Sequence, residues 1–190
     1  MQDSIADFGL GETITGTNDD SVLINGALVG REYTFPVTEE VAKALQMSNR
    51  VIGRRVVARI MRNTTGDHVL AAGEIILVEN TEGHEGLGKA KDLSAADERC
   101  CLVVDPALGS STVALNDLFY AIVKGPTKVK QPATSAPSLV GGDVIKAGAD
   151  GRLAKGAVGS DHGILLGTVV KDNDSVEDAL VEVELAPEWV

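Results

Sequence analysis

The last third of the chain constrains the fold most strongly, because short apolar runs alternate there with tight-turn residues. The strand-like runs are 144–147, 152–155, 163–170 and 180–185. The first two are separated by Asp150-Gly151, where the glycine can adopt the positive φ of a hairpin turn without steric cost. The last run alternates apolar with acidic residues, as a half-buried strand does. Together these runs predict a small β-meander over residues 143–185, with no pocket chemistry in it.

The preceding part of the chain also has a mainly β pattern. One helix is predicted over 39–47, because Thr38 can cap its N-terminus and Glu39 and Glu40 lie in its first turn. Further strands are predicted at 54–61, 74–78, 101–104 and 118–123. The predicted fold class is therefore mainly β, with a sandwich-like or barrel-like body that carries one short helix.

Three parts can be distinguished along the chain. Residues 1–30 are rich in Gly, Thr, Asn and Asp, and predict an extended N-terminal arm. Residues 31–130 form the predicted β-rich domain with the helix. Residues 131–190 begin with a linker-like segment that contains two prolines, at 131–138, and continue into the C-terminal meander.

The composition excludes several functional classes. Aromatic residues make up only 3% of the chain, which argues against base-stacking platforms, and a net charge of −11 repels phosphate. No apolar run reaches the roughly 18 residues that a membrane-spanning helix needs. The two cysteines, Cys100 and Cys101, are adjacent and lack the spacing of metal ligands. We therefore expect a soluble protein made in a cytoplasm, without cofactor or metal, that binds neither nucleic acid nor membranes.

One segment suggests an enzymatic alternative. Residues 83–89 match the glycine and lysine spacing of a phosphate-binding loop, and the apolar run 101–104 ends at Asp105, where such enzymes hold magnesium. However, the metal-binding hydroxyl expected after Lys89 is replaced by Ala90, and Glu85 would repel phosphate inside the loop. A glycine-rich connection between two strands accounts for the same residues, so we expect no enzymatic activity.

Positive charge is concentrated in one place. Within residues 50–62 there are five arginines and no acidic residue: Arg50, Arg54, Arg55, Arg59 and Arg62. These arginines either pair with the protein's own glutamates on a solvated strand face, or form a docking surface for an acidic partner. The second interpretation depends on the bidentate pairs that arginine makes with carboxylates, which persist under partial burial.

Residues 117–126 (DLFYAIVKGP), followed by the Gly-Asp-Val-Ile-Lys-x-Gly-x-x-Gly pattern at 142–151, carry a family resemblance. The chain resembles head decoration (cement) proteins of tailed bacteriophages over residues 117–185, about a third of its length. The resemblance implies a non-enzymatic protein that binds the outer face of an icosahedral shell, commonly as a trimer, and strengthens it by bridging subunits of the major capsid protein.

On this basis we expect a capsid decoration protein located on the virion surface, made in the host cytoplasm and assembled as a homotrimer. The N-terminal arm 1–30 and the arginine-rich segment 50–62 are the expected contacts with the capsid. Two alternatives stay open at this point, namely a phosphate-loop nucleotide-binding enzyme and another virion or tail structural component.

Overall fold

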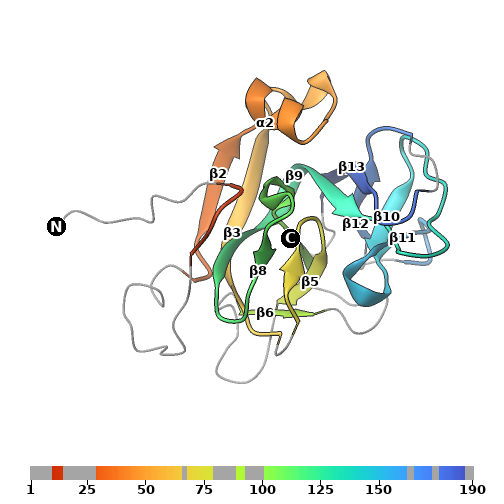
Figure 1. Cartoon of the computed structure of the whole chain (residues 1–190). Coiled ribbons are helices and arrows are strands. Elements are labelled where there is room, and N and C mark those ends of the chain that lie inside the picture. Colours follow the sequence, from red (N-terminus) through yellow and green to blue (C-terminus); the bar gives the residue numbers. More distant parts are fainter. Residues whose placement is uncertain are drawn as a thin grey trace.

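The computed structural model describes residues 10–14, 29–65, 68–78, 89–92, 101–161, 165–172 and 176–186. These residues form a mainly β fold with one short α-helix, α2 (Glu39–Ala44), which confirms the predicted fold class (Figure 1). The strands are β1 (Thr13–Ile14), β2 (Glu32–Pro36), β3 (Arg55–Asn63), β4 (Leu70–Ala71), β5 (Ile75–Val78), β6 (Lys89–Asp92), β7 (Cys101–Val104), β8 (Thr112–Val113), β9 (Leu118–Lys130), β10 (Val144–Ala147), β11 (Leu153–Lys155), β12 (Leu165–Val169) and β13 (Leu180–Leu185).

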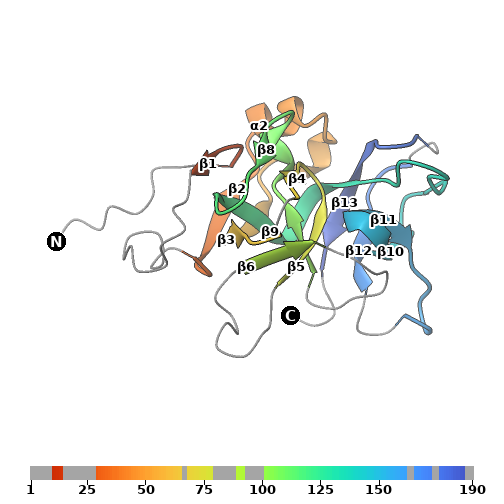
Figure 2. The same ribbon diagram turned by 60° about the horizontal axis from the view of Figure 1, so that its bottom comes forward.

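Five of these strands pair in a closed ring and form a small barrel. β3 pairs with β9, β9 with β7, β7 with β5 and β5 with β6, all antiparallel. β6 returns to β3 in a short parallel pairing, which closes the ring. β2 extends the sheet beyond β3, and the two-stranded sheet of β4 and β8 lies above β5 and β6 in the view of Figure 2. The barrel-like body expected from the sequence is therefore present.

Side chains on the barrel strands alternate between two cores, as the pleat of a β-strand requires. In β7, Leu102 and Val104 belong to one core, whereas Cys101 and Val103 belong to the other. The second of these cores also contains residues of β10 to β13, which lie outside the ring, so it covers the outer face of the barrel. The first core fills the barrel interior: Met61, Leu70, Ala72, Ile76, Leu102, Val104, Leu108, Val113, Phe119, Ala121 and Val123.

The C-terminal strands form a sheet that is continuous with the barrel through β9, the longest strand. The first half of β9 pairs with β3, and its second half pairs with β13 (Figure 1). The strand order is β9-β13-β12-β10-β11, so β12 pairs with β10 and not, as in a simple meander, with β11. After β11, Gly156 donates its backbone N–H to the Val144 carbonyl at 2.8 Å, so the hairpin with β10 extends to the first residue of β10, and β12 then pairs with the other edge of β10.

Two glycines make sharp turns in this sheet. At the β10–β11 hairpin, Asp150 and Gly151 both have positive φ, 56° and 66°, which confirms the predicted turn. In β9, Gly125 has a φ of +104° and lies against the backbone of Arg55 in β3. This residue is located where β9 leaves the barrel and begins to pair with β13, because Gly125 is opposite Leu185. The left-handed backbone of Gly125 therefore redirects the strand that joins the two parts of the molecule.

The helix begins as predicted. The hydroxyl of Thr38 accepts the backbone N–H of Val41 at 3.2 Å, and the two glutamates lie in the first turn. It ends at Ala44 and not at 47, because Gln46 adopts a positive φ of 51°, which terminates the right-handed helix. Ala42 is the residue that the helix buries, whereas Ala44 is exposed.

The predicted division of the chain can be located on this fold. The boundary near residue 130 coincides with the end of β9, but Ile122 before it and Val183 after it contribute to the same outer core. The division into separate domains stays a prediction. Of the predicted arm 1–30, the structure describes 10–14 and 29–30, and β1 pairs there with β9. The rest of the arm lies outside the described residues.

Candidate functional site

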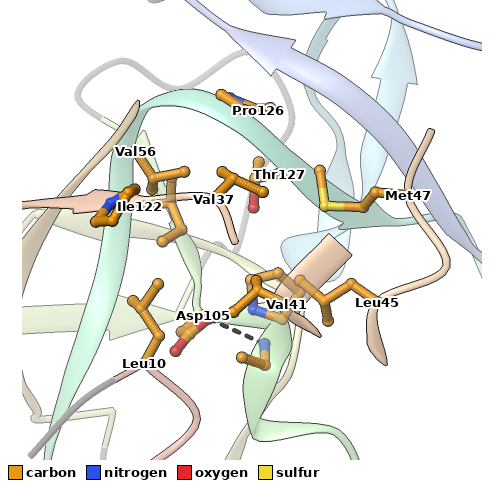
Figure 3. Close-up of a pocket in the computed structure, with 13 residues that line it drawn as sticks. Leu10, Val37, Val41, Leu45, Met47, Val56, Asp105, Ile122, Pro126 and Thr127 are labelled. Carbon is orange, nitrogen blue, oxygen red and sulfur yellow. Dashed lines mark hydrogen bonds between the residues drawn. The ribbon is translucent and has the colours of Figure 1, made fainter. Parts of the chain in front are cut away.

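A small pocket lies where α2, the barrel and β9 meet (Figure 3). Its wall consists of apolar side chains and two polar residues, Asp105 and Thr127. The apolar part of the lining is formed by Leu10, Pro36, Val37, Val41, Leu45, Met47, Val56, Pro106, Ala107, Ile122 and Pro126. Leu10 is contributed by the N-terminal segment, so the pocket is also the place where that segment meets the body of the protein.

Asp105 follows β7 and is only 2% exposed. Its Oδ1 accepts the backbone N–H of Ala107 at 2.9 Å, and its Oδ2 accepts that of Gly11 at 2.6 Å. Burial raises the pKa of this carboxyl to about 6, although the two backbone hydrogen bonds act in the opposite direction. Asp105 therefore caps the short 3-10 helix at Pro106–Leu108 and also fixes the N-terminal segment to the barrel.

Thr127 belongs to β9, is 1% exposed, and its side chain points into the pocket (Figure 3). Its hydroxyl oxygen has no hydrogen-bond partner among the described residues. A buried hydroxyl without a partner costs roughly 1–3 kcal/mol relative to a satisfied one. Thr127 is thus a local destabilising element in a strand that is otherwise closely packed.

The pocket does not have the composition of a catalytic site. Asp105 is the only titratable side chain in its described lining, and both carboxylate oxygens already accept backbone amides. The arrangement instead explains how the N-terminal segment, the helix and β9 are held together.

We predict that the substitution Thr127→Val raises the free energy of unfolding by about 1 kcal/mol, because it removes the unpartnered hydroxyl and keeps the branched shape that a strand favours. Urea denaturation of both proteins measures the change. Thr34→Val is the matched control, since Thr34 is exposed on β2 and the same change should have little effect there. A lower midpoint for Thr127→Val than for the wild type would mean that the hydroxyl is hydrogen-bonded to a bound water.

The structure distributes the five predicted arginines among different environments. Arg54 makes a bidentate ion pair with Glu184 of β13, with both N–O distances at 2.7 Å. Arg59 binds Glu32 of β2 at 2.6 Å and 3.1 Å. Arg62 is 4% exposed. Arg50 and Arg55 are exposed and make no hydrogen bond or ion pair with other described residues. Two of the five side chains are therefore paired within the chain, one is buried and two are exposed, and their role as capsid contacts stays a prediction.

The segment 48–54 is bound to the C-terminal sheet at both ends. Both the backbone N–H and the hydroxyl of Ser48 donate to the carboxylate of Glu182, at 2.9 Å and 2.7 Å, and the far end is fixed by the Arg54–Glu184 pair. Between these anchors lie Arg50, which is exposed, and Ile52, which is 40% exposed. We call this segment the clamped loop.

Sequence reasoning missed the role of Glu182. The alternation in β13 predicts that its acidic residues face water, but Glu182 is only 6% exposed because the clamped loop covers it. The acidic alternation itself was a signal, since it placed two glutamates on one face of a strand. Their partners could not be identified, because Ser48 is 134 positions away in the chain.

The backbone around Lys89 excludes the phosphate-loop alternative. A phosphate loop connects a strand to the N-terminus of a helix, and its lysine belongs to that junction. Here Lys89 is the first residue of a strand, β6, which pairs antiparallel with the preceding strand β5. Asp105, the proposed magnesium ligand, accepts two backbone amides. The remaining residues of that motif, 83–88, lie outside the described residues.

The described residues show neither a metal-binding cluster nor a membrane-spanning helix. In the described part of the chain, no group of three or more His, Cys, Asp and Glu side chains could hold a metal ion. No helix among the described residues is long and apolar enough to cross a membrane. Cys101 is a buried residue of β7, and Cys100 lies outside the described residues.

Comparison with known proteins gives limited matches. No family model matches the chain, and no curated protein matches it. Among solved structures, the N base of the head fiber gp8.5 in bacteriophage phi29 is similar, with a TM-score of 0.44 and 14% sequence identity. The match covers 69% of this chain and 94% of the head fiber base. A likeness of this degree does not by itself assign a fold family or a function.

Proposed function

We propose that this protein is a structural component of a bacteriophage virion that binds the outer face of the capsid and stabilises it by bridging major capsid protein subunits. The resemblance to head decoration proteins carries this proposal. It concerns residues 117–185, which include all of β9 and the C-terminal sheet. The protein would act on the virion surface after synthesis in the host cytoplasm.

The observation that most supports the proposal is the structural use of the motif residues. Gly125 redirects β9 from the barrel to β13, and Gly151 forms the hairpin turn. Asp143 accepts the backbone N–H of Val140 at 2.9 Å and the ammonium of Lys155 at 2.7 Å, which ties the Gly-Asp turn to β11. Each of these motif residues thus builds a rigid sheet, as is expected of a module whose function is to present a surface.

A decoration protein stabilises a capsid because it binds in many copies. Each copy needs only a modest contact with the shell, because many copies bridging neighbouring subunits act together. We also propose that the protein assembles as a homotrimer, since apolar strands with few aromatic residues suit lateral burial between copies. Light scattering at micromolar concentration should then give three times the mass of one chain.

Sedimentation with empty capsid shells of the phage that encodes the chain tests the function. We expect saturable binding and shells that disassemble at a higher denaturant concentration, because a ligand that binds only the assembled state stabilises it. Shells of an unrelated phage are the control and should not bind. Co-sedimentation with purified tails but not with shells would favour another virion component and contradict the proposal.

A further inference from the structure

The clamped loop presents its central residues in a fixed position. Its two ends are held by Glu182 and Glu184 of one strand, through contacts of 2.7–2.9 Å. The backbone that carries the exposed residues Arg50 and Ile52 therefore loses little conformational freedom when a partner binds. An arginine next to an exposed apolar side chain is also the combination found at the centres of protein interfaces.

An open hollow lies beside this loop. It is lined by Ser48 and Arg50 of the loop and by Val170, Lys171 and Asp172, which follow β12. Arg50 and Lys171 thus reach the same hollow from segments that are far apart in the sequence. Both side chains are exposed and make no ion pair with other described residues. Asp172 is the one carboxylate of the lining, and its Oδ1 accepts the backbone N–H of Gly141 at 2.7 Å.

A third cation contributes to the positive charge of this region. Lys128 of β9 lies directly opposite Glu182 in the sheet, next to the anchor of the loop. Burial lowers the pKa of Lys128; the nearby charge of Lys171 also lowers it, whereas Glu182 raises it. The two lysines are therefore close enough to feel each other's charge. Glu182 accepts two hydrogen bonds from Ser48, so its carboxylate is held at the anchor of the loop, opposite Lys128.

We propose that the clamped loop and its hollow form a docking surface for carboxylate side chains of a partner protein, with Arg50 and Lys171 as the charged contacts and Ile52 as the apolar contact. Under the proposed function, on which this choice of partner rests, the carboxylates belong to the capsid protein. This localises the contact to one of the five arginines predicted from sequence and adds a lysine that sequence reasoning did not select.

The size of the positive site distinguishes an acidic protein from a nucleic acid as the partner. The hollow offers two free cations on a compact surface, and nucleic-acid binding needs a basic groove that follows several phosphates. A few carboxylates of a protein surface match this small positive site better.

Binding to shells tests the proposal with three variants. Arg50→Glu and Lys171→Glu should each weaken binding by about tenfold or more, because each reversal places like charges in contact. Arg31→Glu is the matched control. Arg31 is exposed and precedes β2 at the end of the β2–β3 pair opposite the clamped loop, so binding should be unchanged. Circular dichroism and urea midpoints should be the same for all four proteins, since neither arginine nor Lys171 makes an ion pair in the described structure.

A second measurement tests the docking surface independently of the proposed function. Titration of the isotope-labelled protein with polyglutamate should shift the backbone signals of Arg50, Ile52 and Lys171. If shells bind all variants equally, the docking surface is wrong and the function stands. If shells do not bind but polyglutamate shifts these signals, the function is wrong and the surface stands. If polyglutamate shifts other signals only, or if a single-stranded oligonucleotide binds the hollow more tightly than polyglutamate, the acidic-protein surface is overturned.

Discussion

The substitution Gly125→Ala is expected to destabilise the protein by roughly 3 kcal/mol or more, since it combines two separate costs. Gly125 has a φ of +104°, a conformation that residues with a side chain rarely adopt. In addition, a Cβ at this position would collide with the carbonyl oxygen of Arg55 in β3. Neither strand can retreat easily, because β3 and β9 pair along most of the length of β3.

Two other glycines separate the two costs. Gly142 has a φ of +94°, but a Cβ there would have no neighbour within 4 Å, so Gly142→Ala should cost only about 1–2 kcal/mol. Gly167→Ala tests the other cost, because the φ of Gly167 is ordinary but a Cβ there would collide with the carbonyl of Glu184. Urea denaturation of the three variants measures both effects. If Gly125→Ala costs no more than Gly142→Ala, the contact between Gly125 and β3 does not constrain the fold.

The bounds of several strands could be predicted from the sequence, but the length of β9, which contains Gly125, could not. The bounds of β7, β10 and β13 agree with the sequence pattern: β13 alternates apolar and acidic residues, and β7 and β10 are short, mainly apolar runs. The prediction for β9 stopped at 123, because Gly125-Pro126 has the composition of a strand end. The strand continues because β13 pairs with β9 from Gly125 to Lys130, with Pro126 opposite Glu184.

The candidate site was less accessible to sequence reasoning, because its contacts join distant parts of the chain. Asp105 binds Gly11, 94 positions away, and Arg54 binds Glu184, 130 positions away. The sequence identified the arginine cluster and both possible environments, but it could not distinguish a paired arginine from a free one. Arg54 and Arg59 are paired and Arg50 is not, because their partners depend on which strands are neighbours in the sheet. The order of the strands cannot be derived from composition or periodicity.

The stability of the protein should fall as the pH rises from about 4 to about 6.5, through the ionisation of Asp105. Burial raises the pKa of this carboxyl to about 6 in the folded chain, from 3.8 in the absence of the fold. Between these values the folded state binds a proton that the unfolded state has already released. Stability therefore decreases with pH in this window, and the pKa difference corresponds to about 3 kcal/mol.

Asp105→Asn tests this prediction, because the amide is similar in shape and does not ionise. The amide also introduces a cost that does not depend on pH, since its NH₂ group would face one of the two backbone N–H groups that the carboxylate accepts. In urea denaturation, the free energy of unfolding of the variant should therefore rise by about 3 kcal/mol relative to that of the wild type between pH 4 and pH 7.

Asp143 and Asp161 have lowered pKa values, so their ionisation affects stability at more acidic pH and in the opposite direction. Both are present in the two proteins, so their effect cancels in the comparison. Parallel stability curves would show that water reaches Asp105 and that the N-terminal segment does not seal the pocket.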